Sequence, residues 1–435
     1  MKLHGAGFIV TRKEAAALGL GTVPGLERHI REYRNGRDLA ATPRDVLVID
    51  LFGLDADEVR QRFPAVYQWV QERVKPEREQ NNRSTYRDNW WLFGEPRKDL
   101  RPALKNLPRY IATIETAKHR TFQFLGANVL PDNMLIAIAV HDLLWLGVLS
   151  SSTHVAWALA AGGRLGVGND PRYNKSRCFD PFPFPSDDAG LTSELTTRIR
   201  TLAEQLDAHR KARQAAHPEL TLTGMYNVLE KLCTGEALTP RDKLIHAHGL
   251  VSVLKSLHDD LDAAVLAAYG WADLQSVLAD RTRPEARAAA VETLLERLVA
   301  LNTRRAAEEA TGHVRWLRPD FQQRGAGVQT GIDLPLEDDP ASDRTTDPTT
   351  DAVTEHAAPA QAVPKRPWPA GLPEQIKAVA DTLATSPGAL SLADIESRFS
   401  ARGRWRERLP TILDTLEALG RARRTQAAAP RWQGA

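Results

Sequence analysis

The stretch RYIATIETAKHRTFQFL, residues 109–125, decides how the most informative part of this chain folds. Two runs rich in β-branched and aromatic residues, YIATI and TFQFL, flank a short polar segment, which predicts two strands joined by a loop. The loop would carry Glu115, Lys118, His119 and Arg120. A glutamate can accept a hydrogen bond from cytosine and an arginine can donate two to guanine. From the residues alone, however, an ordinary solvated hairpin end is the preferred interpretation of this loop.

Short β-rich and helical patterns surround this stretch, so an α+β protein is expected. Gly7–Val10 and Val46–Phe52 are β-rich runs flanked by turn residues, and Asp57–Arg73 has apolar residues at helical spacing. Between residues 90 and 185, aromatic and β-branched runs alternate with Gly, Pro and Asn turns, and a helix is predicted at Ser152–Ala161.

The rest of the chain predicts two further kinds of structure. Apolar residues repeat at helical spacing between residues 190 and 310, which predicts a helical bundle. Residues 333–364 are rich in Asp, Thr, Ala and Pro, a composition typical of disorder. Three helices and a β-turn-β are expected beyond them. The expected parts are an N-terminal mixed α/β segment (1–88), a strand-rich domain (89–189), a helical region (190–325), a disordered acidic linker (326–366) and a small winged-helix-like module (367–435).

The composition argues against an exported or membrane protein. The two cysteines, Cys178 and Cys233, are too few for a disulfide framework and lack zinc-site spacing, which favours a reducing, cytoplasmic location. Residues 1–11 lack the pattern of a signal peptide. The longest apolar stretch, Leu135–Leu149, contains a histidine and an aspartate and is shorter than the roughly 20 residues that a membrane helix needs.

The distribution of charge says more than the net charge of +2. Between Arg83 and Arg177 there are 13 lysines and arginines against 7 acidic residues, whereas Asp333–Glu355 holds 8 acidic residues and one arginine. The basic surplus therefore lies in the strand-rich part, where it would suit contacts to DNA phosphates.

Several separated motifs occur in one order along the chain. They are WWLFGEPR (90–97), RYIATIETAKHRTFQFL (109–125), LGVLSSSTHVAW (146–157), YNKSRCFDPFPFP (173–185), MYNVLEKL (225–232) and LVSVLKSLHDDLDAAVLAAYGW (250–271). The first four resemble the target recognition domain of MmeI-like restriction-modification enzymes, which join a nuclease, an adenine-specific DNA methyltransferase and a recognition domain in one chain. The last two resemble the C-terminal helical region of that family. The resemblance spans about residues 1–322.

The resemblance implies sequence-specific recognition of double-stranded DNA in a restriction-modification, phage-defence system. It makes Glu115, Lys118, His119 and Arg120 candidates for reading DNA bases. The family's glycine loop for S-adenosylmethionine and its Asn-Pro-Pro-Tyr/Phe motif do not occur here in their proper context. We therefore expect no cofactor-binding or catalytic residues in this chain. A separate methyltransferase chain or domain would bind S-adenosylmethionine and flip the target adenine. An inactive remnant of a longer methyltransferase gene and a free-standing regulator that uses its winged helix are the alternatives.

Basic, amide and glycine residues and one tyrosine of the strand-rich part are candidates for contacts to DNA phosphates and grooves, with a solvated face or a flexible hairpin as the alternative. These candidates are Arg97, Arg101, Arg109, Arg164, Gly166, Gly168, Asn169, Arg172, Tyr173, Asn174, Lys175 and Arg177. In the C-terminal module, arginines gather before the third helix and on the wing, where a winged helix would contact the DNA backbone; a protein-binding module is the alternative. The arginines proposed for this contact are Arg402, Arg404, Arg406, Arg408, Arg423 and Arg424.

Two glycine- or proline-containing patterns imitate parts of a methyltransferase. Gly5-Ala6-Gly7 precedes a strand instead of following one, so it lacks the setting of a phosphate-binding loop. Asn169-Asp170-Pro171-Arg172-Tyr173 has an arginine where the adenine-gripping motif has its second proline. Neither is expected to be a catalytic or cofactor site.

Other polar and aromatic residues are expected to be structural. Ser150–Ser152 and His154 lack the strained turn of a nucleophile, and the serines would cap a helix. His246 and His248 are two residues apart, an awkward spacing for one helix face, with no further ligand cluster close in sequence, so no metal site is expected. The aromatic residues expected in the core are Trp90, Trp91, Phe93, Phe122, Phe124, Trp145 and Trp157.

Overall fold

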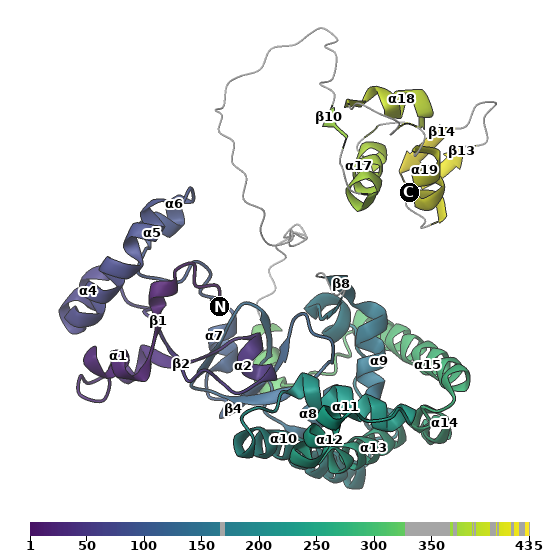
Figure 1. The fold of residues 1–435 in the computed structure, drawn as a ribbon, viewed down its shortest axis with the longest axis horizontal. Coiled ribbons are helices and arrows are strands. Elements are labelled where there is room, and N and C mark those ends of the chain that lie inside the picture. The colour runs from purple at the N-terminus through teal and green to yellow at the C-terminus, as the bar shows by residue number, and fades with distance from the viewer. Residues whose placement is uncertain are drawn as a thin grey trace. The chain divides into compact units, whose positions relative to one another are not determined.

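The computed structural model describes residues 1–165, 170–326, 366–368, 372–384, 386, 389–400, 406, 409–418, 422–425 and 431–434. The chain divides into two compact units, Met1–Asp333 and Leu334–Ala435 (Figure 1). The predicted linker, residues 326–366, lies outside the described residues except at its two ends.

The first unit combines small sheets with many helices, as expected for an α+β protein. Its described strands are β1 (Ile9–Val10), β2 (Ile30–Arg34), β3 (Leu47–Ile49), β4 (Arg109–Ile114), β5 (Gln123–Gly126), β6 (Val129–Pro131), β7 (Leu135–Ile138), β8 (Gly163–Leu165) and β9 (Asp170–Arg172). Its described helices are α1 (Arg12–Ala17), α2 (Gly36–Ala40), α3 (Ala56–Arg62), α4 (Pro64–Arg73), α5 (Lys75–Glu79), α6 (Ser84–Asp88), α7 (Leu100–Leu104), α8 (Leu143–Ser150), α9 (Ser152–Ala161), α10 (Ser193–Ala216), α11 (Leu222–Thr234), α12 (Pro240–Gly249), α13 (Val251–Ala268), α14 (Gln275–Ala279), α15 (Pro284–Ala310) and α16 (Pro319–Ala326).

The N-terminal segment (1–88) is joined to the strand-rich segment (89–189) by a shared four-stranded sheet of order β1-β3-β2-β6. The apolar strand β3 is buried along its whole length between antiparallel β1 and β2, and β2 pairs in parallel with β6, with Tyr33 opposite Leu130. The amino group of Met1 also donates to the carbonyl of Pro131 over 2.7 Å. Helix formation over residues 57–73 is interrupted at Phe63, because Pro64 begins a new helix, α4.

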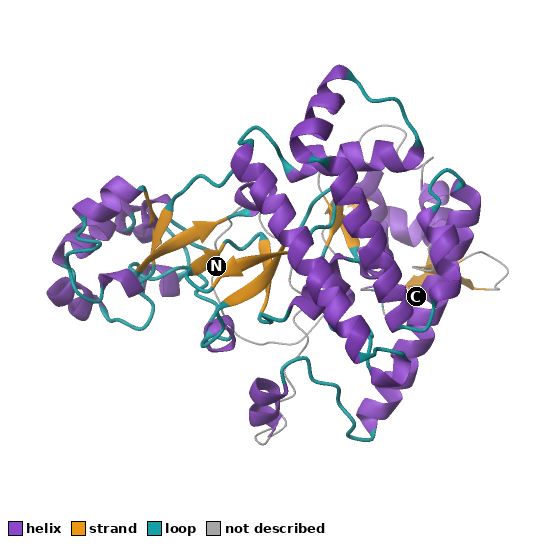
Figure 2. Cartoon of the chain, turned by 90° about the horizontal axis from the view of Figure 1, so that it is seen from below, coloured by secondary structure: helices purple, strands orange, loops and turns teal. Residues whose placement is uncertain are grey.

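The predicted strands of residues 109–125 are present and form the core of a second sheet, of order β5-β4-β7. β4 pairs antiparallel with both neighbours, and Ile111 lies opposite Phe124 on one side and Ile138 on the other. Most strands of the first unit lie between the N-terminal helices and the helical region (Figure 2).

One continuous hydrophobic core runs from Ile111 in β4 to Leu301 in α15. The predicted boundary at residue 189/190 therefore does not separate two cores. Gly147 of α8 allows a close approach to α10, because a side chain there would meet the Cγ2 atom of Ile199 at 2.5 Å. The sheet, and with it the loop between β4 and β5, is thus held by the helical region.

Helix α9 begins at Ser152 as predicted, and the Ser151 hydroxyl caps it by accepting a hydrogen bond from the His154 amide. Within the described residues no single helix has the length and apolar character to cross a membrane. The pair α8–α9 passes that test only when joined across a bend of 62°. Leu146, Val148 and Leu149 of this pair are fully buried within the unit.

The second unit has its own small core, which includes Val379, Ile395, Leu413 and Trp432. A three-stranded antiparallel sheet has the order β11-β14-β13. Helices precede and follow β11 in an order compatible with the winged helix, which stays a prediction. The described elements are β10 (Arg366–Pro367), α17 (Leu372–Ala384), β11 (Leu390–Ser391), α18 (Leu392–Ser397), β12 (Phe399–Ser400), α19 (Leu409–Ala418), β13 (Ala422–Thr425) and β14 (Arg431–Gly434).

Candidate nucleic-acid interface

The loop between β4 and β5 is fastened to the hairpin strand β9, some fifty residues later in the chain. The amide of Tyr173 donates to the carbonyl of Glu115 over 2.7 Å, and the amide of Ala117 donates to the carbonyl of Pro171 over 3.3 Å. Thr116 and Arg172 form an isolated antiparallel bridge between these contacts. The two clusters that the sequence predicted separately, in the loop and around β9, therefore form one surface.

Arg120 supports this loop from inside. Its side chain is buried, and its two terminal nitrogens donate to the hydroxyl of Thr113 and to the carbonyls of Ile114, Glu115 and Pro171. Burial lowers the pKa of Arg120 to about 10, which leaves the guanidinium charged at neutral pH. The prediction that Arg120 reads a base needs correction, because its terminal donors already hold main-chain groups that would otherwise lack partners.

Glu115 is also turned toward the protein. Its Oε1 atom lies 2.6 Å from Nε of Arg172, and only 15% of its side chain is exposed. This ion pair ties the loop to β9 a second time. Glu115 and Arg172 are therefore paired with each other in this structure, and either would have to leave its partner to contact DNA.

The tip of the loop carries Lys118 and His119, which converge on a residue from the helical region. Lys118 Nζ and His119 Nε2 lie 2.7 and 2.8 Å from Oδ1 of Asn227 in α11. The ring of Tyr226 lies against that of His119, with centroids 5.9 Å apart. Lys118 is exposed, and both tip residues line a cavity of about 570 Å³ between the loop and the helices.

Asn227 is the residue of this surface that the sequence reasoning missed. Its Oδ1 receives two donors, and among the described residues its amide nitrogen has no hydrogen-bond partner. A polar amide within the apolar helical motif MYNVLEKL was the one available signal. Lys118, His119 and Asn227, called the tip cluster below, offer cation, imidazole and amide groups of the kinds that contact base edges and phosphates.

Tyr173 does not belong to this surface. Its side chain is only 1% exposed, and its hydroxyl lies 2.9 Å from Nε2 of the buried His154. Burial lowers the pKa of His154 to about 3 and raises that of Tyr173. The prediction of a groove contact for Tyr173 is therefore corrected to a core position. The same contact removes His154 from any nucleophile arrangement with Ser150–Ser152.

Other cations lie around β9. Arg164 opposes Pro171 in the β8–β9 hairpin and is exposed, and Lys175 and Arg177 are exposed on the π-helical turn Lys175–Phe179 that follows. Lys175 is paired with Asp180 over 2.8 Å, and Asn174, half-buried, begins this turn. The remaining predicted contacts at the hairpin end, Gly166, Gly168 and Asn169, lie outside the described residues.

Arg97, Arg101 and Arg109, which were predicted to contact DNA phosphates, instead contact other residues of the protein. Arg101 makes two hydrogen bonds of 2.7 and 2.8 Å to the carboxylate of Asp50, and Arg109 stacks over Phe124 at 4.0 Å. Arg97 is half exposed and lies 3.0 Å from Glu95. Arg101 is a structural residue here, since its partner at the end of β3 is buried.

The winged-helix candidates are only partly covered by the structure. Arg406, Arg423 and Arg424 are exposed, and Arg406 lies 3.4 Å from the carboxylate of Glu396. The guanidinium of Arg424 lies 5.6 Å from the ring centroid of Trp432. The other candidates, Arg402, Arg404 and Arg408, lie outside the described residues.

No metal site was expected, because His246 and His248 have no further ligand cluster near them in the sequence. In the folded chain, residues distant in sequence lie beside His248. His248 is not alone: the loop after α10 brings His217 and Glu219 beside it, and their ligand atoms lie within 4.8 Å of one another. His246, the neighbour considered from the sequence, instead contacts the hydroxyl of Ser252 over 2.9 Å.

Comparison with known proteins agrees with the resemblance seen in the sequence. The family described as MmeI, target recognition domain, matches residues 1–186. DNA methyltransferase A of Bacillus subtilis (strain 168) is 32% identical over 80 residues, which are 18% of this chain and 8% of that protein. A structure of the Type IIL restriction-modification enzyme MmeI in complex with DNA has a TM-score of 0.45 at 19% identity, covering 66% of this chain and 35% of that one. This chain thus spans a small part of both proteins, and the family match carries the assignment: residues 1–186 are a target recognition domain of the MmeI type.

Proposed function

We propose that this chain selects a DNA sequence for a methyltransferase of a restriction-modification system. The observation that carries the proposal is the family match over residues 1–186, because the β4–β5 loop lies within that segment. Supporting it, the loop has a base held by hydrogen bonds from the buried Arg120 and a polar tip at Lys118 and His119. A fixed loop conformation suits base recognition, since donors must be held in place to distinguish one base edge from another.

Within the tip cluster we assign different parts to the cation and the amide. Lys118 is exposed and would contact a phosphate, which fixes the position of the protein on DNA without reading sequence. Asn227 would read a base, because an amide can donate and accept at the edge of adenine once Lys118 or His119 releases its oxygen. The exposed Arg164 and Arg177 would add further phosphate contacts.

The methyl transfer itself we assign to a separate domain or chain. That partner would bind S-adenosylmethionine and flip the target adenine, and this chain would supply position and specificity. The two cysteines are free thiols, which is compatible with the cytoplasmic location that we propose for such a system.

Selection from a randomised pool of duplex DNA tests the proposal, with the catalytic partner present where one is known. Asn227→Ala should weaken binding by about 1–3 kcal/mol and relax the preference at one position. Lys118→Ala should weaken binding to all sequences alike and reduce the slope of log affinity against log salt by about 1. The matched control is Lys243→Ala, an exposed lysine on α12, which should bind as the wild type does.

Two results would count against the proposal. If the wild-type chain enriches no DNA sequence with the partner present, it does not recognise a specific sequence and the proposal is wrong. Identical sequence profiles for the wild type and Asn227→Ala would remove Asn227 from the reading surface.

A further inference from the structure

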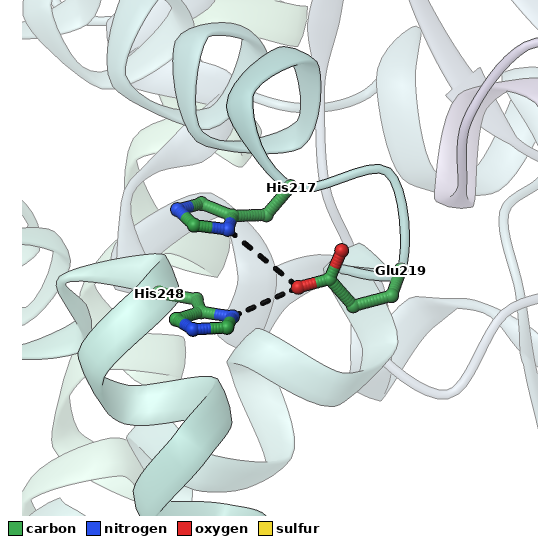
Figure 3. A group of neighbouring side chains, drawn as sticks. All are labelled: His217, Glu219 and His248. Carbon is green, nitrogen blue, oxygen red and sulfur yellow. Dashed lines mark hydrogen bonds and ion pairs between the residues drawn. The ribbon is translucent and has the colours of Figure 1, made fainter.

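Two histidines and a glutamate meet where three helices of the first unit end or begin. His217 is the C-terminal cap of α10, Glu219 lies in the short connection to α11, and His248 lies in the last turn of α12. Oε1 of Glu219 lies 2.8 Å from Nδ1 of His248 and 3.6 Å from Nδ1 of His217. Figure 3 shows one nitrogen of each imidazole ring directed at the same carboxylate oxygen of Glu219.

We propose that His217, Glu219 and His248 bind a divalent transition-metal ion of the Zn²⁺ class through their two Nδ1 atoms and the carboxylate. Two imidazoles with one carboxylate are a ligand set that zinc accepts, with water in the remaining position. The same set is poor for Mg²⁺ and Ca²⁺, which prefer oxygen ligands. The proposal goes beyond DNA recognition and does not rest on it.

The positions of these residues are fixed by contacts of the surrounding main chain. Nε of Arg213 donates to the carbonyl of His248 over 2.6 Å, and the hydroxyl of Thr42 donates to the carbonyl of Pro218 over 2.6 Å. Leu220, next to Glu219, is buried. The three ligands therefore stand on a backbone that is already in place, which lowers the cost of assembling a metal site.

The side chains themselves have room to close around an ion. The exposed fractions are 27% for His217, 32% for His248 and 56% for Glu219. The two imidazole rings stack with centroids 4.1 Å apart and planes 14° from parallel, so rotation about the side-chain torsions of at least one histidine must turn the two Nδ1 atoms toward one point. Zinc–nitrogen bonds of about 2.0–2.1 Å place two ligand atoms about 3.3 Å apart, and the ligand atoms of the three residues already lie within 4.8 Å of one another.

The carboxylate of Glu219 and Nδ1 of His248 now contact each other over 2.8 Å. An ion bound through both atoms would take the place of this contact, with the proton of that histidine on Nε2. An ion at this point would tie the end of α10 to the end of α12 and would fix the start of α11, the helix that carries Asn227.

Titration calorimetry of the full, chelator-treated chain with Zn²⁺ at neutral pH tests the site. We expect one ion per chain, and at least about tenfold weaker binding in each of His217→Ala, Glu219→Gln and His248→Ala. The matched control is His246→Ala, which removes a histidine from the same helix but not from the cluster and should keep wild-type affinity. Mg²⁺ should give no binding.

Thermal unfolding gives a second readout that separates a lost site from a lost fold. Zn²⁺ should raise the melting temperature of the wild type and of His246→Ala, because an ion that binds only the folded state stabilises it. It should leave the melting temperature of His248→Ala unchanged, while that variant without metal melts close to the wild type. Absence of Zn²⁺ binding by the folded wild type would overturn the proposal. Equal loss of affinity in His246→Ala and His248→Ala would do so too, since the ion would then sit elsewhere.

Discussion

An arginine in the β4–β5 loop can either read a DNA base or support the loop from inside, and replacing Arg120 distinguishes these two roles. Its terminal nitrogens serve four acceptors, and three of these are main-chain carbonyls. Hydrogen bonds to a charged group contribute about 1.5–3 kcal/mol each, and they do not add fully, because the carbonyls of an opened loop regain water. We therefore expect Arg120→Ala to reduce the free energy of unfolding by about 3–5 kcal/mol.

Two assays test this. Urea unfolding of the full chain, monitored by tryptophan fluorescence, measures stability, and selection from a randomised DNA pool measures sequence preference. Arg120→Lys should lose a smaller part of the stability, because one ammonium can reach only some of the four acceptors. Arg109→Ala, on the neighbouring strand β4, is the control; the Arg109 guanidinium stacks over Phe124, and its loss should cost about 1 kcal/mol. In Arg120→Ala, binding to all sequences should weaken together, because the loop as a whole loses its base.

A wild-type unfolding midpoint for Arg120→Ala, combined with a changed preference at one base position, would refute this reasoning. Arg120 would then have to leave its buried position when DNA binds. The result would restore the base-reading role that the sequence first suggested.

Three further predictions concern pH, the cofactor and the second unit. Burial holds the pKa of His154 at about 3, whereas an unfolded histidine titrates near about 6.5; the unfolded state therefore takes up a proton first, and the folded state should lose about 1.4 kcal/mol per pH unit as the pH falls from about 6 toward 3. The His154→Gln variant should show a shallower loss in urea midpoints measured between pH 7 and pH 5. Calorimetry of this chain with S-adenosylmethionine should show no binding, since neither the glycine loop nor the adenine-gripping motif is present in its proper context; a micromolar isotherm would contradict this. Limited proteolysis should cut within residues 333–364 and release a C-terminal fragment that binds duplex DNA with little sequence preference and a steep dependence on salt, whereas a folded fragment without affinity at low salt would argue for a protein-binding module.

The strands β4 and β5 could be predicted from residues 109–125 because alternation of apolar residues is a local signal. The inward direction of Arg120 could not, because one of its acceptors is the carbonyl of Pro171, fifty-one residues away along the chain. Asn227 was missed for the same reason, since its partners Lys118 and His119 lie in another element. Local patterns thus predict the elements, and long-range contacts decide which side chains face outward.

The same distinction between local patterns and long-range contacts explains why the cluster of His217, Glu219 and His248 could not be predicted from the sequence. Metal ligands are recognised in a sequence by short, regular spacing. Here twenty-nine residues separate Glu219 from His248, and the two meet only because α10 and α12 end at the same place. His246, the histidine close to His248 in the sequence, contacts Ser252 and is not part of the cluster.

The division of the loop into a buried base and a polar tip has a consequence for specificity. The bonds of Arg120 go mainly to carbonyls, which every residue possesses, so the loop conformation depends little on which side chains stand at the tip. Lys118 and His119 contact a side chain of a different element, Asn227, and their contacts are polar and partly exposed. If this chain has the function proposed above, substitutions in the tip cluster should change the groups offered to DNA at little cost in stability, whereas a substitution at Arg120 should remove the support on which any choice of tip residues depends.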